Sequence, residues 1–353
     1  MKMHSISSRS PNEPRANKDP MTRLIQIQRD RVRRVAIVEE PNIRFLEACD
    51  TVYELAQIAI DTGKKLSEVA RQRARQDTMD YDLIYSGRSE WRLLPAIDHP
   101  REPARCLLSG TGLTHVGSAR GRQSMHATAA ENLTDSMKMF QWGVQGGRPA
   151  AGRIGVPPEW FHKGTGRSLR AHGESLDIPF FADDGGEEAE IAGLYIIARD
   201  GRPYRIGMAV GNEFSDHEFE KKNYLYLAGS KLRMCALGPE ISLDCEFNSI
   251  PVVATIVRDG TVLWSKSFQT GESEMCHSLQ NIEHHHFKFE AHRRPGDVHV
   301  HFFGTDCLSF TDQVRLQDGD VMQVTAKGFG RPLLNPVHRD KSTPALVNVI
   351  PLR

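Results

Sequence analysis

Several stretches of this chain alternate apolar and polar residues, a pattern typical of β-strands. Residues 187–197 and 204–211 are two such stretches, separated by the polar turn RDGRP, and they predict a pair of strands. Residues 243–269 alternate around the turn RDGT and predict a β-hairpin. A further short strand is predicted to begin in RRVAIVEE, from residue 33.

Helical periodicity is confined to the first third of the chain. A helix ended by Gly63 is predicted from the apolar spacing of Phe45, Ala48, Val52, Leu55, Ala56 and Ala59. A second helix is predicted in KLSEVARQRARQ, and residues 80–97 suggest a hairpin-like region. The Pro-containing link at 99–110 marks a boundary, so we predict a disordered extension (1–20), a small N-terminal domain (21–105) and a larger domain (106–353).

Composition narrows the class of protein. The 353 residues are 39% hydrophobic, enough for a sizeable core, and 45 basic residues balance 45 acidic ones. This balance argues against a nucleic-acid or anionic-membrane surface. No apolar run approaches about 18 residues, the length that a transmembrane helix needs, so none is expected. The six cysteines are scattered and form no C-x-x-C, so we expect a reducing, cytoplasmic location.

Candidate chemistry begins with Glu188 and Glu190. Because strand side chains alternate faces, two glutamates spaced in this way leave the same face about 7 Å apart and can converge on one cation. Oxygen ligands favour Mg²⁺ or Mn²⁺ over Zn²⁺. The alternative is that both carboxylates form the solvated face of an antiparallel strand. The three histidines at 284–286 cannot all face one ion from regular structure, and we interpret them as a solvated loop.

The order of these motifs resembles the core signature of the fumarylacetoacetate hydrolase family. It comprises the E-x-E pair, a polar turn, a second strand, the acidic loop NEFSDHE, the lysine of AGSKL and the sequence ALGP, and the resemblance covers about residues 105–340. It implies that Glu188, Glu190 and Glu213 bind Mg²⁺ (or Mn²⁺). Glu213 stands where the family usually has the shorter Asp, and Ser215 is implied near the substrate.

Later segments extend the resemblance. GDVHVHFFGTDCLSF matches a family strand and turn, which implies that Gly304 and Thr305 bind a substrate carboxylate, and residues 318–335 match the final hairpin. GVPPEWFHK implies that Lys163, with Trp160, lines the pocket, the alternative being an ordinary surface lysine. The implied fold is mainly β (α+β), a fumarylacetoacetase C-terminal-like mixed β-roll or sandwich with a small N-terminal α/β domain, and the implied assembly is a homodimer.

The resemblance also bears on reaction type. Family hydrolases have a His followed by a Glu that activate water, but here Ser118 occupies the place of the His. His126 and Glu131 could re-form such a pair, or could be exposed residues of a helix. KNYLYLAGSKLRMCALGP is similar to the corresponding segment of archaeal 2-keto-3-deoxy sugar-acid dehydratases, in which Lys231 would act on the enolate or transfer a proton.

Three functions therefore remain open. The first is dehydration of a 2-keto-3-deoxy pentonate, such as an arabinonate or xylonate, to a 2,5-dioxo acid. The second is hydrolysis of a carbon–carbon bond in a diketo acid, and the third is an inactive sugar-acid-binding protein. In the first, a lysine beside a cation is expected to have a lowered pKa and to act as a base.

Overall fold

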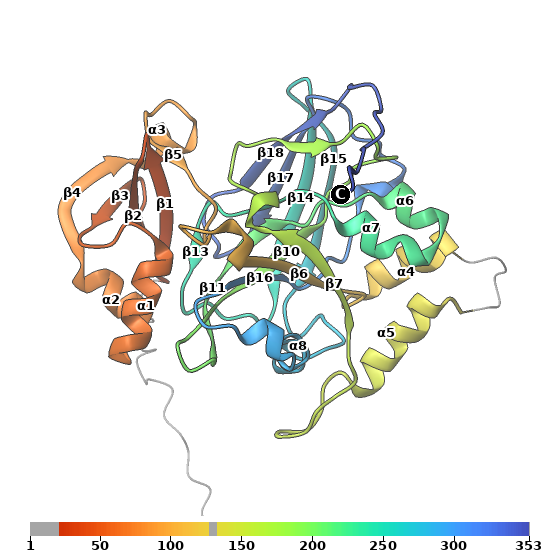
Figure 1. Ribbon diagram of the computed structural model, residues 1–353, viewed down its shortest axis with the longest axis horizontal. Coiled ribbons are helices and arrows are strands. Elements are labelled where there is room, and N and C mark those ends of the chain that lie inside the picture. The colour runs from red at the N-terminus through yellow and green to blue at the C-terminus, as the bar shows by residue number, and fades with distance from the viewer. Residues whose placement is uncertain (1–20, 127–132, 353) are drawn as a thin grey trace, which may run out of the picture.

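The computed structural model describes residues 21–126 and 133–352. Two β-sheets, one of 13 strands and one of five, form the framework, with helices at the edges (Figure 1). The N-terminal strands and three helices form a smaller lobe beside the larger part of the molecule. The prediction of a mainly β (α+β) fold is confirmed. Glu131 lies outside the described residues.

The large sheet contains β1 (Arg23–Arg29), β2 (Val32–Glu39), β3 (Asn42–Leu46), β4 (Ala74–Asp80), β5 (Arg92–Leu93), β6 (Cys106–Gly112), β7 (Glu159–Thr165), β8 (Leu169–Arg170), β10 (Ala189–Ile197), β11 (Pro203–Asn212), β12 (Cys235–Leu237), β13 (Ile241–Ser242) and β16 (Val298–Phe302). Its order is β4-β3-β2-β1-β13-β11-β10-β16-β6-β7. The smaller sheet contains β9 (Leu176–Ile178), β14 (Ile250–Arg258), β15 (Thr261–Thr270), β17 (Val321–Ala326) and β18 (Leu333–Arg339). Its order is β15-β14-β17-β18-β9.

The helices are α1 (Val52–Thr62), α2 (Leu66–Gln72), α3 (Tyr81–Tyr85), α4 (Val116–His126), α5 (Asp135–Gly146), α6 (His217–Lys222), α7 (Leu227–Lys231) and α8 (Leu279–Phe287). Short 3₁₀ turns lie at Pro103–Arg105, Gly166–Ser168, Tyr224–Tyr226, Glu290–Arg293 and Ser309–Asp312. In the described part of the chain, no helix combines the length and apolar character needed to cross a bilayer.

The predicted strand pair is present as β10 and β11. All nine residues of β10 are buried, because β11 and β16 flank it and both of its faces are covered. A strand buried on both faces reads as a nearly continuous apolar run, which explains the weak alternation of this stretch. The predicted hairpins at 243–269 and 318–335 are confirmed as β14–β15 and β17–β18.

The first predicted helix is α1, which starts later than its apolar periodicity suggested. The Thr51 hydroxyl accepts a hydrogen bond from Glu54 N and caps the helix, so Phe45 falls in β3 instead. Gly63 ends the helix in the left-handed conformation, φ 65°, as predicted. Val52, Leu55 and the two later alanines of the pattern are buried.

Two other N-terminal predictions need correction. The second helix ends at Gln72, and β4 follows it, because the chain pairs with β3 from Ala74 onward. The hairpin-like region at 80–97 is wrong: Asp80 caps α3 through a hydrogen bond from Asp82 N, and only Arg92–Leu93 form a strand.

The histidine triplet is also not a solvated loop. It lies in α8, and His285 and His286 are buried against the rest of the molecule. His286 Nε2 lies 2.9 Å from His299 Nδ1 of β16, and Trp160 Nε1 donates to His286 Nδ1 at 3.2 Å. His301, two residues along β16 from His299, bonds to hydroxyls of β6 through both ring nitrogens. The histidines therefore form a packed layer between α8 and the large sheet.

This layer predicts sensitivity to acid. Burial lowers the pKa of His299 and of His301 to about 3, whereas both would titrate near 6.5 in the unfolded chain. Their contribution to stability is complete above about pH 6.5 and is lost as the pH falls toward 3. Together the two groups lower the free energy of unfolding by about 3 kcal/mol between pH 6.5 and 5. The free energy of urea unfolding, measured across this pH range, should show the loss. His301→Asn should reduce the slope of that free energy against pH by about one proton, and an unchanged slope would contradict the assignment.

Glu240 joins the N-terminal lobe to the larger part. Its Oε2 accepts from Arg23 Nη1 of β1 at 2.8 Å, and its Oε1 accepts from Tyr81 Oη at 3.1 Å and from Arg331 N at 3.0 Å. The Arg331 guanidinium carbon lies 4.0 Å from the Tyr81 ring centroid. One buried carboxylate thus holds groups from three distant segments.

Replacing Glu240 with Ala is therefore expected to lower the free energy of unfolding by about 3 kcal/mol, since it leaves a partly buried arginine and a buried hydroxyl without their acceptor. Denaturant unfolding at neutral pH measures the loss. Glu90→Ala is the control, because Glu90 pairs with Arg29 at 3.4 Å on the surface and should change stability by less than about 0.5 kcal/mol.

Candidate metal centre and active site

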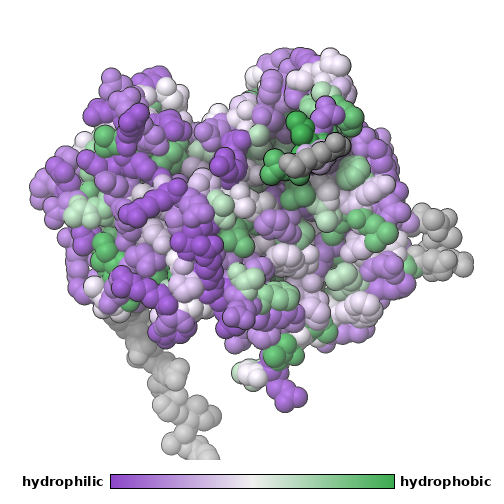
Figure 2. All heavy atoms as spheres, in the orientation of Figure 1, coloured by the Kyte–Doolittle hydropathy of each residue, from purple (hydrophilic) through white to green (hydrophobic). Residues whose placement is uncertain are grey.

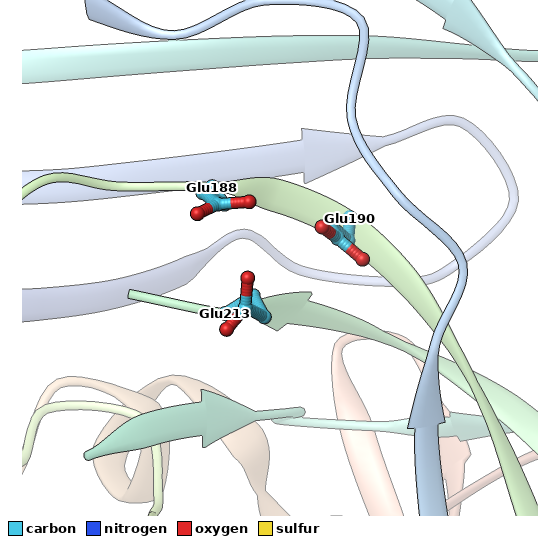
Figure 3. Close-up of side chains that lie close together, drawn as sticks. All are labelled: Glu188, Glu190 and Glu213. Atoms are coloured by element: carbon cyan, nitrogen blue, oxygen red, sulfur yellow. The ribbon is translucent and has the colours of Figure 1, made fainter. Parts of the chain in front are cut away.

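Three glutamates converge at one end of the β10–β11 pair. Each of Glu188, Glu190 and Glu213 offers a carboxylate oxygen, and these atoms lie within 4.8 Å of one another (Figure 3). All three side chains are buried, at 8%, 2% and 0% exposure. The alternative of a solvated strand face is therefore wrong.

Backbone pairing explains this convergence. Ala189 of β10 lies opposite Asn212 of β11, and Glu213 N donates to Glu188 O at 2.9 Å, so the residues flanking this pair face each other. The Asn212 side-chain oxygen accepts from Glu188 N at 3.2 Å and from Phe214 N at 3.3 Å. Phe214 has a positive φ of 32°, which bends the chain away from β11 after Glu213.

The cluster holds more negative charge than it can stabilise alone. Burial, then Glu213 and Glu188, raise the pKa of Glu190 well above its usual value. Burial and the neighbouring Glu188 raise the pKa of Glu213 to about 7. Burial also opposes ionisation of Glu188, but Lys231 and His217 outweigh it and lower that pKa. Buried carboxylates of this kind, all oxygen donors, fit a divalent cation such as Mg²⁺.

Lys231 lies directly on this cluster. Its ammonium donates to Glu188 Oε1 and to Glu213 Oε2, the second at 2.6 Å. Burial disfavours the charge on Lys231, but Glu188 and Glu213 outweigh burial and raise its pKa. In the chain without metal the lysine is therefore an ammonium held by two carboxylates, and the expectation of a lowered pKa beside a cation stays a prediction.

Lys163 and Ser215, which were implied to contact the substrate, lie at the site but contact the Glu213 carboxylate. The Lys163 ammonium is fully buried, lies 2.7 Å from Glu213 Oε1, and donates to the carbonyls of Phe214 and Lys231. Ser215 Oγ donates to both oxygens of Glu213, at 3.2 and 3.3 Å. The structure thus places Lys163 behind Glu213 instead of in the cavity, where the resemblance had implied it.

Trp160 is also displaced from its expected position. On β7 the side chains of Glu159, Phe161 and Lys163 face the site, and the Lys231 ammonium lies 4.7 Å from the Phe161 ring centroid. Trp160 points the other way, to His286 of α8. The same alternation that excludes Trp160 brings in Glu159.

A narrow cavity adjoins the carboxylates. It is lined by Gly112, Leu113, Ser118, Arg122, Met125, Glu188, Glu190, His217, Glu220, Lys231, Gly304, Thr305 and Leu308. Gly304 and Thr305 therefore lie where a substrate in this cavity would contact them. Gly304 N, however, already donates a hydrogen bond to Glu190 Oε2 at 2.7 Å. The Thr305 hydroxyl donates to Cys307 O at 3.1 Å. The role implied for this turn, binding of a carboxylate, stays a prediction.

A second cluster of charged residues, which the sequence did not indicate, lies beside the three glutamates. Arg122 of α4 bonds Glu220 Oε1 at 2.5 Å and Glu159 Oε2 at 3.5 Å, and Tyr224 Oη donates to Glu159 Oε2 at 3.2 Å. Burial raises the pKa of Glu159, and its Oε1 has no hydrogen-bond partner in the described structure. This oxygen lies beside Gly112, where a Cβ would approach it to 1.9 Å.

Of the two residues proposed as a water-activating pair, only His126 lies within the described residues. Ser118 Oγ donates to His115 O at 2.9 Å, so it serves the start of α4. His126 does not line the cavity; its ring lies 6.4 Å from the Tyr224 ring, and burial lowers its pKa. His115 is buried between two threonine hydroxyls, and burial lowers its pKa to about 4.

Part of this chain is similar in sequence to a protein named as a dehydratase. No protein-family model matches the chain. The chain is 29% identical over 178 residues to a probable 2-keto-3-deoxyxylonate dehydratase of Haloferax volcanii, a match that covers 49% of this chain and 58% of that protein. The similarity thus spans a little more than half the length of this relative.

Comparison of structures covers the whole molecule. The apo structure of a 2-keto-3-deoxy-D-arabinonate dehydratase has a TM-score of 0.67 and 20% identity, with 91% of this chain and 100% of that chain covered. A structure of the dehydratase complexed with magnesium and 2,5-dioxopentanoate has the same TM-score at 19% identity and the same coverage. The 5-carboxymethyl-2-hydroxymuconate delta-isomerase of Mycobacterium smegmatis reaches 0.52 at 17% identity, with 91% and 100% covered. The chain has the fold expected for the fumarylacetoacetate hydrolase superfamily and resembles its 2-keto-3-deoxy sugar-acid dehydratase branch.

Proposed function

We propose that this protein is a Mg²⁺-dependent dehydratase that converts a 2-keto-3-deoxy pentonate, such as an arabinonate or xylonate, to a 2,5-dioxo acid. The observation that carries the proposal is the pair of differently held carboxylates, Glu159 and Glu220, beside the three-glutamate cluster. Elimination of water needs an acid and a base beside the substrate but no water nucleophile. The similarity in sequence and fold to proteins named as such dehydratases supports the same choice.

The charge balance supports a divalent cation. Within the connected group, and leaving out Glu159, which serves as the proton donor, four carboxylates face three cationic side chains: Glu188, Glu190, Glu213 and Glu220 against Arg122, Lys163 and Lys231. A divalent cation held by Glu188, Glu190 and Glu213 would offset the excess of negative charge. When bound, Mg²⁺ supplies a Lewis acid that polarises the 2-oxo group of the substrate.

The acid and the base follow from the surroundings of each carboxylate. Glu159 is the proton donor to the hydroxyl that leaves carbon 4, since burial raises its pKa and so favours its protonated form. Glu220 is ion-paired with Arg122, lines the cavity, and is the base for the proton on carbon 3. The Lys231 ammonium stabilises the negative charge that develops on the substrate oxygen. This step releases one water and leaves a 5-hydroxy-2-oxo-3-enoic acid. A proton shift from carbon 5 to carbon 3 then gives the enol of the 2,5-dioxo acid, which becomes the aldehyde with no further loss.

Replacing Glu159 with Gln tests the acid. We expect turnover to fall about 10²- to 10⁴-fold, because the amide cannot donate a proton to the leaving hydroxyl. Substrate binding should change little, since the amide keeps the size of the side chain. Steady-state kinetics measures the change, and Glu102→Gln, an exposed residue of the link before β6, is the control. A fall in kcat of less than about tenfold would assign the acid to another group.

A panel of substrates tests the reaction type. The protein with Mg²⁺ is incubated with 2-keto-3-deoxy pentonates and with acylpyruvates, and products are followed by mass. Loss of one water from a deoxy sugar acid supports dehydration. Cleavage of an acylpyruvate with gain of water would replace the proposal with a hydrolase, and conversion of neither class would favour the inactive binding protein. Repeating the assay with Mn²⁺ distinguishes the two candidate ions.

A homodimer and a cytoplasmic location, both expected from the sequence, stay predictions.

A further inference from the structure

One face of α4 lines the cavity beside the carboxylates. It presents Ser118, Arg122 and Met125, which are spaced four and then three residues apart and so lie on the same side of the helix. Each residue advances a helix by about 1.5 Å, which places Ser118 and Met125 about 10 Å apart along the axis, with Arg122 between them. The three side chains therefore mark successive levels of the cavity.

The start of α4 is anchored beside the metal ligands. Gly117 N donates to Asp306 Oδ1 at 2.7 Å, and a Cβ on Gly117 would approach Asp306 O to 2.0 Å, so the two segments are in close contact. Asp306 comes two residues after Gly304, whose N donates to Glu190 Oε2. From this end α4 runs past Arg122 to Met125, so Met125 lies at the level of the cavity farthest from the start of the helix.

Met125 also lines a second pocket, here called the outer pocket. Its volume is about 430 Å³, and its other lining residues are Ser124, Lys221, Phe310, Thr311, Gln313 and Arg315. All of these except Phe310 are polar and exposed. Hydrophilic residues also cover much of the molecular face shown in Figure 2. The outer pocket is therefore a polar site at the surface, whereas most residues around the carboxylates are buried.

The cavity and the outer pocket adjoin each other. Of the described residues, Met125 alone lines both. The His217 ring, which lines the cavity, also lies 5.2 Å from the ring of Phe310, which lines the outer pocket. The Phe310 ring is held by two cations, with Arg315 at 5.0 Å and Lys221 at 5.9 Å from its centroid. Met125 is therefore part of the wall that separates the two spaces.

We propose that Met125 limits the substrate to five carbons by closing the cavity at the end away from the metal ligands. The inference rests on the proposed function, which puts carbons 1 and 2 at the metal and carbons 3 and 4 at Glu220 and Glu159. Arg122 pairs with both of these glutamates, and Met125 lies about one turn of α4 beyond Arg122. Carbon 5 therefore meets the Met125 side chain, and a sixth carbon would overlap it.

Shortening this side chain would join the cavity to the outer pocket. The added space in Met125→Ala has a polar lining, which accepts the hydroxyl groups of a six-carbon sugar acid. Met125→Leu would keep the wall, because Met and Leu have similar volumes. The two variants thus separate the size of the side chain from every other effect of replacing it.

Binding of unreactive probes tests the length limit without catalysis. The probes are unbranched 2-oxo acids of four to seven carbons, titrated by calorimetry in the presence of Mg²⁺. For the unaltered chain we expect the six-carbon acid to bind at least about tenfold more weakly than the five-carbon acid, the effect of one methylene that does not fit. In Met125→Ala the difference should fall below about threefold, and Met125→Leu should retain it.

Met79→Ala is the matched control, because Met79 is a partly buried methionine of the N-terminal lobe. It should leave the preference for length unchanged. Comparing two acids within each variant cancels any general loss of affinity. Equal binding of the five- and six-carbon acids by the unaltered chain, binding of none of the probes, or an unchanged preference in Met125→Ala would overturn the proposal.

Turnover separates this proposal from the proposed function. With a 2-keto-3-deoxy pentonate and a 2-keto-3-deoxy hexonate as substrates, Met125→Ala should raise the hexonate-to-pentonate ratio of kcat/KM at least about tenfold. A shifted binding preference with no dehydration by any variant would support the length limit and remove the dehydratase. Dehydration of the pentonate with an unchanged ratio of kcat/KM in Met125→Ala would keep the dehydratase and overturn the length limit.

Discussion

Removing divalent metal with EDTA is expected to abolish turnover, and adding Mg²⁺ is expected to restore it. Replacing Glu190 with Gln should lower activity at least about 10³-fold and weaken metal binding, because one of three anionic ligands is lost from a dry site. Glu190 is the carboxylate whose ionisation the other two most oppose, so a cation is what would make its charge favourable.

Two measurements check this expectation. Calorimetric titration with Mg²⁺ reports binding without substrate, and kinetics at saturating metal reports turnover. Asp183→Asn is the control, because this carboxylate lies near the site but pairs with the exposed Lys222. Full turnover in protein stripped of metal, or unchanged metal affinity in Glu190→Gln, would remove the metal assignment.

Replacing Lys231 with Met should abolish turnover, by about 10²- to 10⁴-fold, while metal binding is kept or strengthened. The reason is that the ammonium hydrogen-bonds to Glu188 and Glu213, so lysine and cation compete for the same oxygens. Removing the lysine leaves these carboxylates to the metal. If the lysine instead only supported the fold, metal affinity and thermal stability would fall together.

The control for this variant is Lys222→Met, which removes a lysine that pairs with Asp183 on the surface. It should leave turnover and metal affinity unchanged. Loss of metal binding in Lys231→Met would show that the lysine organises the carboxylates instead of acting on the substrate.

The pair Glu188 and Glu190 could be predicted because the two residues lie two apart on one strand, so alternation alone puts them on one face. Glu213, which follows the adjacent antiparallel strand, was implied only by the family resemblance. The hairpin at 243–269 was predictable from its local pattern, whereas the hairpin-like region at 80–97 was not. The roles of the three glutamates as metal ligands remain the proposal tested above.

The second charged group could not be predicted in this way. Arg122, Glu159 and Glu220 come from α4, β7 and α6, and only tertiary packing brings them together. One signal was present: Glu159 stands two and four residues before Phe161 and Lys163, on the same face of β7. In the chain without metal the pKa of Lys231 is raised, because Glu188 and Glu213 both reach it, and this contact depends on the placement of the loop after β11.

The same limit applies to the histidine triplet. Three consecutive polar residues suggested a solvent-exposed loop, but His286 is buried under the large sheet and hydrogen-bonds to residues of β7 and β16. A polar residue can enter a core when distant strands supply its hydrogen bonds, and sequence alone does not reveal those strands.

The pairing of β1 with β13 makes the two lobes one continuous sheet. Leu24 and Val35 of the first lobe share a single apolar core with Leu194 and Phe302 of the second. A chain cut at residue 105 would expose an unpaired strand edge and half of that core, and such edges promote aggregation. We therefore expect the two lobes to unfold as one unit. Destabilising substitutions in the first 80 described residues, far from the carboxylate cluster, should then reduce activity in the cell by lowering the amount of folded protein.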